Sequence, residues 1–310
     1  MKKQLRGSII LLLAAIIWGG AFVAQSEGMD YLSPFTYNCV RMLIGGVVLV
    51  PVILLSDLLR PREERLTAPA NRALLKRSLL GGVISGVILF GASAFQQFGI
   101  AQTTVGKAGF VTALYIVLVP IFGAFFKKKI PPITWLCVVI AIVGFYLLCI
   151  KEDFTVAPGD LLVLCCAVIY TFHILAIDRF TEQGVDGVVM ADVQFFVCGL
   201  ISLVCTLIFE EVSWSALLDA KWSLLYTGVL SCGAAFTFQI IGQRDCEPTA
   251  ATLIMSLESV FSVLFGWLIL HERLSGKELT GCALVFLAVI LAQIPLPKKG
   301  KTAFSGKNEE

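Results

Sequence analysis

The chain has 310 residues, of which 57% are hydrophobic and only 15% are charged, with a net charge of +2 and a mean hydropathy of +0.87. Soluble domains carry about 25% charged residues, and this chain has too little polar surface to cover a water-soluble body of its size. The composition excludes a soluble globular protein, a disordered chain, a collagen-like fibre and a nucleic-acid-binding protein. It indicates a chain that crosses a membrane several times.

Ten apolar runs follow one another along the chain, and a membrane-spanning helix needs about 20 such residues. The runs are 8–26, 33–56, 79–101, 105–126, 131–150, 160–177, 188–209, 223–243, 248–270 and 278–294. The first run resembles the core of a secretion signal, but it continues to Ala24, which favours an uncleaved first span. The basic, polar residues 298–310 predict a disordered cytoplasmic tail.

Lysine and arginine predict the orientation, because they concentrate in cytoplasmic loops. With the N-terminus inside, the cytoplasmic segments hold 18 of the 24 Lys and Arg residues and the outer segments hold five. The one that remains, Arg41, lies within a span. We therefore expect a multi-pass protein of the cell (inner) membrane with both termini cytoplasmic.

The ten runs divide into two sets of five, residues 1–150 and 151–297. When Gly91–Gln102 is aligned with Cys232–Gln243, four of twelve positions are identical. An odd number of spans per half inserts the second half upside down, as in many secondary transporters, whose substrate site lies near the midplane between the halves. The predicted fold is therefore an all-α integral membrane protein of ten transmembrane helices, arranged as two inverted-topology five-helix repeats. An unduplicated bundle is the alternative.

Several short motifs carry a family resemblance. They are Trp18–Phe22 in the first run, Gly106–Tyr115 in the fourth, Gly159-Asp160 before the sixth, and Leu257–Phe261 followed by His271–Ser275 around the ninth. Their order and spacing resemble the drug/metabolite transporter (DMT) superfamily, in particular its ten-span EamA-like branch. The resemblance implies metabolite transport, commonly efflux, with very diverse substrates. One departure is that 127–129 are all lysine where the second half has His271-Glu272-Arg273.

Two ionisable residues lie deep within predicted spans, where a charge costs about 2.5–3.5 kcal/mol on insertion scales. Arg41 lies in the second span and Glu258 at the middle of the ninth, at depths that differ by only about 5 Å. Arg41 could hold a substrate carboxylate or phosphate with its planar guanidinium, and Glu258 could bind an amine or titrate. The structural alternative is a buried ion pair between the two.

Polar and aromatic side chains recur on one face of seven spans, which favours a polar substrate cavity over interhelical hydrogen bonding alone. With Arg41 and Glu258, the predicted substrate-binding residues are Trp18, Gln25, Tyr37, Asn38, Gln96, Gln97, Tyr115, Tyr170, His173, Gln194 and Gln239. His173 is either a hydrogen-bonded structural group or a proton relay. The fifth and tenth spans carry almost no polar residues and are predicted to pack outside, where they could form a homodimer contact.

The predicted function is secondary active transport of a small polar metabolite, an amino acid, a related compound or a drug, in the efflux direction and by alternating access around a midplane cavity. Proton coupling through Glu258 or His173 is a separate hypothesis. The alternatives are an intramembrane enzyme and a channel. His271-Glu272 lacks the second histidine of a zinc hydrolase, and no ring of charge or repeated carbonyl filter is visible. We expect no enzymatic activity, metal or cofactor, and we expect the ten cysteines to be buried packing residues.

Overall fold

The computed structural model describes residues 2–59, 68–123, 132–150, 156–246 and 248–293, and every regular element within these ranges is a helix. The first half comprises α1 (Lys2–Gly28), α2 (Pro34–Leu59), α3 (Ala68–Ile100), α4 (Val105–Ala113), α5 (Tyr115–Gly123) and α6 (Pro132–Cys149). The second comprises α7 (Pro158–Glu182), α8 (Gly187–Phe209), α9 (Trp214–Asp219), α10 (Lys221–Leu225), the π-helix η3 (Tyr226–Ala235), α11 (Phe236–Asp245), α12 (Pro248–Met255), α13 (Glu258–Ile269) and α14 (Gly276–Gln293). The predicted tail, 298–310, lies outside the described residues.

Helical segments occupy all ten of the apolar runs. Within the described residues, seven helical stretches are long and apolar enough to cross a membrane, among them Lys3–Gly28, Ala70–Ile100, Val105–Gly123 and Lys221–Gln243. Two further apolar helical stretches, Ile133–Cys149 and Leu253–Ile269, are shorter. The chain is therefore a multi-pass helical membrane protein, and the expectation of ten spans remains a prediction.

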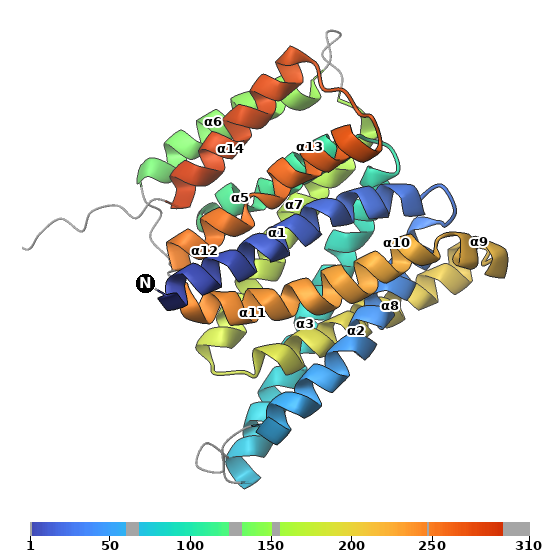
Figure 1. The fold of residues 1–310 in the computed structure, drawn as a ribbon, viewed down its shortest axis with the longest axis vertical. Coiled ribbons are helices and arrows are strands. Elements are labelled where there is room, and N and C mark those ends of the chain that lie inside the picture. Colours follow the sequence, from blue (N-terminus) through green and yellow to red (C-terminus); the bar gives the residue numbers. More distant parts are fainter. Residues whose placement is uncertain (1, 60–67, 124–131, 151–155, 247, 294–310) are drawn as a thin grey trace, which may run out of the picture.

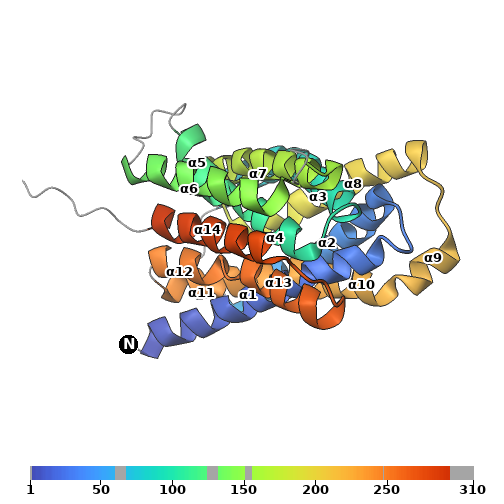
Figure 2. The same cartoon turned by 90° about the horizontal axis from the view of Figure 1, so that it is seen from above.

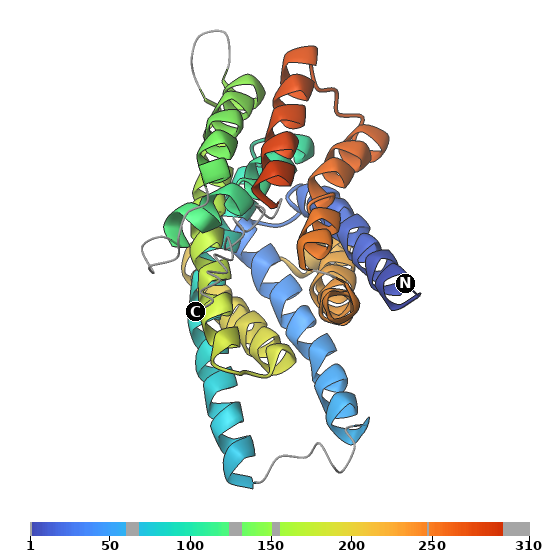
Figure 3. The same cartoon turned by 90° about the vertical axis from the view of Figure 1, so that its left-hand side faces the viewer.

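The helices form one bundle with two distinct ends (Figure 1). The N-terminal end holds the start of α1 and the end of α14. The opposite end, here the α9 end, holds α9 together with the starts of α2, α4, α7 and α14. Figure 2 shows α9 far from the N-terminus. In Figures 1 and 3, α6 and α14 lie side by side at one edge, while α2 and α3 extend to the opposite edge.

The packing of the helices follows a pattern that links the two halves. α3 of the first half packs most extensively on α7 of the second half, and the corresponding contact is that of α1 with η3 and α11. In the same way, the contact of α3 with α8 corresponds to that of α2 with η3. Three further pairs join helices at matching positions in the two halves: α2 with α8, α4 with α13, and α6 with α14. Each of the contacts named here therefore either has a counterpart with the two halves exchanged or joins matching helices of the two halves.

Three of the predicted spans are not regular α-helices. The fourth is broken at Leu114, between α4 and α5, and the ninth is broken at Ser256 and Leu257, between α12 and α13. The eighth contains the ten-residue π-helix η3. π-Helical turns are rare and occur frequently at functional sites, and discontinuous helices are typical of substrate sites in transporters. The middle of the bundle is thus the region where the helices depart from regularity.

The surface of the bundle is apolar, as a lipid environment requires. Trp135, Val139 and Ile142 project from α6, and Trp214 and Trp222 are strongly exposed near the α9 end, where aromatic residues suit a membrane–water interface. Of the ten cysteines, eight are buried, two are half-buried and none forms a disulfide. The expectation that cysteine acts here as a packing residue agrees with this burial.

Candidate substrate site

Arg41 is buried where α2, α3 and α8 meet, and its side chain is held from one side. Its Nε donates to Asn38 Oδ1 at 3.1 Å, one turn earlier on α2. Asn38 Nδ2 in turn donates to Ser93 Oγ of α3 at 3.0 Å and to Ser202 Oγ of α8 at 2.9 Å. Asn38 is wholly buried, so these bonds fix the amide and, through it, the guanidinium.

The Nη2 atom of the Arg41 guanidinium meets no acceptor among the described residues. This atom is buried, and Arg41 itself is 5% exposed. A buried guanidinium normally has all its donors paired, because leaving a charged donor unsatisfied is costly. The unpaired donors suit an acceptor that the protein does not supply, and a carboxylate matches the planar fork of arginine.

Aromatic side chains lie beside this position. Tyr170 of α7 is within electrostatic range of Arg41. Its ring lies 6.2 Å from that of Tyr115, the first residue of α5, and 5.7 Å from the imidazole of His173. The structure thus brings residues predicted on the second, fourth and sixth spans toward one place.

Glu258 is the first residue of α13, directly after the break in the ninth span, rather than in the middle of a continuous helix as the sequence suggested. Its carboxylate makes no hydrogen bond or ion pair within the described residues, and it interacts electrostatically with Tyr115. Tyr115 is thus the first residue of α5 and Glu258 the first residue of α13, each directly after the break in its span. The two broken spans are in contact, because α4 packs on α13.

The predicted alternative of a buried Arg41–Glu258 ion pair is wrong for this conformation. No ion pair joins the two residues within the described part of the chain, because Arg41 is directed to Asn38 while the neighbour of Glu258 is Tyr115. Both charges remain available for other partners.

Other predicted residues bond to neighbouring helices. The Tyr37 hydroxyl contacts Ser223 Oγ at 2.7 Å and Thr227 Oγ1 at 3.1 Å and donates to the Ala24 carbonyl, which joins α2 to α1 and the eighth span. Trp18 Nε1 donates to the Ser231 carbonyl at 3.3 Å. These side chains fix helices against one another rather than facing an open space.

Each of the five predicted glutamines forms a side-chain hydrogen bond, and two of them also have an oxygen atom without a partner among the described residues. Gln25 Nε2 donates to the main-chain carbonyl of Ala21 and Gln97 Nε2 to that of Gln25, but the Oε1 atoms of Gln25 and Gln97 are buried without a partner among the described residues. The remaining pairs are Gln96 with Thr112 at 3.4 Å, Gln194 with His173 at 3.0 Å, and Gln239 with Met255 at 3.4 Å. His173 Nδ1 also lacks a partner.

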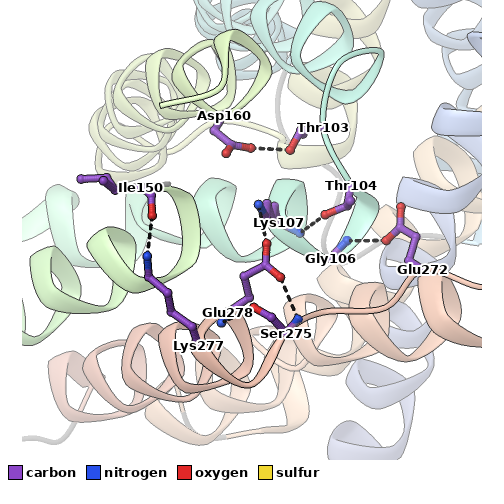
Figure 4. A network of polar contacts seen from close by, with 10 residues as sticks. All are labelled: Thr103, Thr104, Gly106, Lys107, Ile150, Asp160, Glu272, Ser275, Lys277 and Glu278. Atoms are coloured by element: carbon purple, nitrogen blue, oxygen red, sulfur yellow. Dashed lines mark hydrogen bonds and ion pairs between the residues drawn. The ribbon is translucent and has the colours of Figure 1, made fainter. Parts of the chain in front are cut away.

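A second polar cluster lies at the α9 end, and sequence reasoning did not find it (Figure 4). Glu272, in the loop after α13, accepts hydrogen bonds from Val105 N at 2.8 Å and Gly106 N at 3.3 Å, the first two amides of α4. Lys107 Nζ pairs with Glu278 Oε1 at 2.6 Å. In the sequence, His271-Glu272 stood out only as an incomplete zinc motif and as part of the family resemblance.

Two further contacts join the halves at this end. Thr103 Oγ1 donates to Asp160 Oδ1, in the first turn of α7. Glu210 accepts from Phe35 N at 2.9 Å and from Thr36 N at 2.7 Å, and so caps the start of α2. Carboxylates at helix N-termini are favoured by the exposed amides and by the helix dipole. Each contact joins a residue before 150 to one after 156.

Comparison with known proteins decides the family. The sequence profile described as "EamA-like transporter family" matches residues 5–150 and again residues 157–293. The chain belongs to the EamA-like transporter family. It is therefore a membrane transporter by family, as its apolar helices also indicate, and the resemblance drawn from its motifs is confirmed.

Relatives of this EamA-like chain extend along nearly its whole length. An "Uncharacterized transporter" of Archaeoglobus fulgidus is 29% identical over 94% of this chain and 87% of its own. The "Uncharacterized transporter YoaV" of Bacillus subtilis is 23% identical over 94% of this chain and 97% of its own. A solved structure, titled "Crystal structure of protein", is 21% identical with a TM-score of 0.63 and covers 93% of this chain and 97% of its own, which shows a shared fold.

Proposed function

We propose that this protein is a secondary transporter that moves a small polar metabolite bearing a carboxylate, such as an amino acid or a related compound, out of the cell. The observation that carries the proposal is the buried guanidinium of Arg41, fixed on one side by Asn38 and without a partner at Nη2. A buried charge within a membrane protein is expensive unless it is paired, and here the missing partner would be the substrate.

We further propose that the chain works as two inverted repeats, 1–150 and 151–297, of five spans each, with both termini cytoplasmic. The two separate matches of one family profile support a duplication, as does the exchange of packing partners between the halves. The excess of Lys and Arg in the predicted cytoplasmic segments, 18 against five, supports the orientation. The α9 end would then face outward.

Alternating access in such a protein needs helices that bend near the midplane. The breaks before Tyr115 and Glu258 supply these points in the two halves, and η3 supplies another. Glu258, at the start of α13, would bind an ammonium group of the substrate or carry a coupled proton, and His173 beside Tyr170 is the second candidate for proton coupling.

The test is flux of a panel of radiolabelled metabolites into proteoliposomes, with Arg41→Gln as the variant. Arg179→Gln is the matched control, because Arg179 is 72% exposed at the end of α7. Losing charge-assisted hydrogen bonds worth about 1.5–3 kcal/mol should reduce transport of carboxylate substrates by roughly 10–100-fold without reducing thermal stability. Normal flux in Arg41→Gln with a carboxylate substrate would overturn the proposal.

The same liposomes separate the remaining possibilities. Saturation of the flux distinguishes a carrier from a channel, and chemical analysis of the transported compound distinguishes transport from an enzymatic conversion. Proton coupling predicts that an imposed pH gradient drives accumulation in the wild type and not in Glu258→Gln. Accumulation unaffected by the gradient would remove the proton from the cycle.

The edge formed by α6 and α14 is our candidate for a homodimer contact. Trp135, Val139 and Ile142 lie along one exposed face of α6, each more than half exposed. Disulfide crosslinking through Val139→Cys in native membranes should give a covalent dimer. A product that remains monomeric would assign this face to lipid alone.

A further inference from the structure

A hollow lies at the α9 end of the protein, and Arg41 is not part of its lining. Its volume is about 600 Å³, within the range of small-molecule sites. It lies among the ends of α1 and α3 and the starts of α4 and α7. Its lining includes Asp30, Gln102, Thr103, Lys107 and Asp160. The space is large enough for an organic molecule rather than a bare ion.

Asp160 is the most unusual residue of this lining. It is 1% exposed, its Oδ1 accepts from the Thr103 hydroxyl, and its Oδ2 is buried without a nitrogen or oxygen donor among the described residues. The Cys149 thiol, which is only a weak donor, interacts with this carboxylate, and the Lys107 ammonium lies within its electrostatic range. Gly159 allows the arrangement, because a Cβ there would meet Gln102 within 3 Å. The chain thus holds a half-satisfied carboxylate in the wall of a hollow.

The charge that remains in the hollow is negative. Lys107 is the cation of this lining, and its Nζ is already paired with Glu278 at 2.6 Å. Asp30, at the rim, is exposed and makes no side-chain contact within the described ranges. Gln102 uses its Nε2 to bond the Phe98 carbonyl, which leaves Oε1 as an acceptor. Three residues of the lining, Asp160, Asp30 and Gln102, therefore retain an acceptor oxygen.

We propose that this hollow is a vestibule that binds the ammonium group of the transported metabolite, with Asp160 Oδ2 as its principal acceptor and Asp30 at the rim. An ammonium group has three donors and no acceptor, which matches the set of groups available. The proposal rests on the proposed function in identifying the ligand with the transported metabolite. It adds a binding place for the ammonium group of that metabolite at the α9 end, apart from Arg41 and Glu258.

Binding can be measured without transport by labelling a cysteine placed in the hollow. Gln102→Cys is suitable because Gln102 is exposed and lines the space, while the ten native cysteines, all buried or half-buried, give the background in the wild type. The methanethiosulfonate carrying trimethylammonium should react faster than the one carrying sulfonate. Asp160→Asn should lower that ratio by at least about threefold, because a buried charge focuses the local potential.

Protection against labelling identifies the ligand class. Glycinamide carries an ammonium group, N-acetylglycine a carboxylate, and N-acetylglycinamide neither. Glycinamide should slow labelling at position 102 by at least threefold, and this protection should disappear in Asp160→Asn and weaken in Asp30→Asn. Glu27→Gln is the matched control, since Glu27 is exposed on α1 outside the lining.

Three outcomes would overturn the proposal: no protection by glycinamide, equal protection in Asp160→Asn, or protection by N-acetylglycine, which would assign the site to Lys107 and an anion. Asp160→Asn keeps the acceptor for Thr103, and Asp30→Asn changes an exposed residue, so at least one variant retains the fold. Since labelling requires no flux, failure here leaves the Arg41 test untouched. If Arg41→Gln transports normally while glycinamide still protects position 102 from labelling, only the proposed carboxylate site at Arg41 is overturned.

Discussion

The cap that Glu272 forms on α4 gives the most direct test of the contacts at the α9 end. Its two carboxylate oxygens accept from the first two amides of the helix, and Thr104 Oγ1 accepts from the third, Lys107 N, at 3.4 Å. In Glu272→Ala both amides lose their partner, at about 1 kcal/mol each, and the helix dipole loses its compensating charge, at about 0.3–1 kcal/mol. The expected loss of stability is about 2–3 kcal/mol.

The measurement is unfolding in detergent, by heat and by titration with a denaturing detergent, with Glu211→Ala as the control. Glu211 is exposed and adjacent to the α2 cap residue Glu210, so its loss should cost less than about 0.5 kcal/mol. Glu272→Gln keeps one acceptor oxygen, so its stability should lie between those of Glu272→Ala and Glu211→Ala. If Glu272→Ala unfolds at the same temperature and the same detergent concentration as Glu211→Ala, the Glu272 carboxylate does not stabilise α4 and the reasoning fails.

Three further predictions concern single positions. His271 has a φ of 55°, which favours glycine, so His271→Gly should stabilise the protein by up to about 1 kcal/mol in thermal unfolding; destabilisation would contradict this. A Cβ at Gly109 would overlap Ser262 of α13, so Gly109→Ala should cost about 1–3 kcal/mol, partly rescued by Ser262→Gly, and an unchanged melting temperature would refute the close packing. The Arg6–Asp245 pair, 2.7 Å apart but with Arg6 66% exposed, should contribute less than 1 kcal/mol in a double-mutant cycle, and a larger coupling would show that solvent does not screen it.

The positions of the helices follow from hydropathy because an apolar run in lipid must satisfy its own backbone hydrogen bonds. The breaks within them could not be predicted in the same way. Leu114 and Leu257 are ordinary helix formers, and neither break carries a glycine or a proline. No residue that ends helices therefore marks either break, so hydropathy and helix propensity do not locate them.

The candidate site shows the same division. Arg41 and Asn38 are three residues apart on one helix, so their shared face could be read from spacing. The partners of Asn38 on α3 and α8, and the absence of a partner for Nη2, depend on tertiary structure. Glu272 and Asp160 were visible in motifs, but which helix end each would meet was not.

The contacts at the α9 end have a consequence for energy conversion. Four of them, Glu272 on α4, Glu210 on α2, Lys107 with Glu278, and Thr103 with Asp160, each join the two halves. In the alternating-access cycle proposed above, their summed free energy would contribute to the population of the conformer open at this end. Reversing a 99:1 population requires about 5.5 kcal/mol of differential ligand affinity. Weakening a single contact would therefore raise the open population without substrate and turn coupled transport partly into leak.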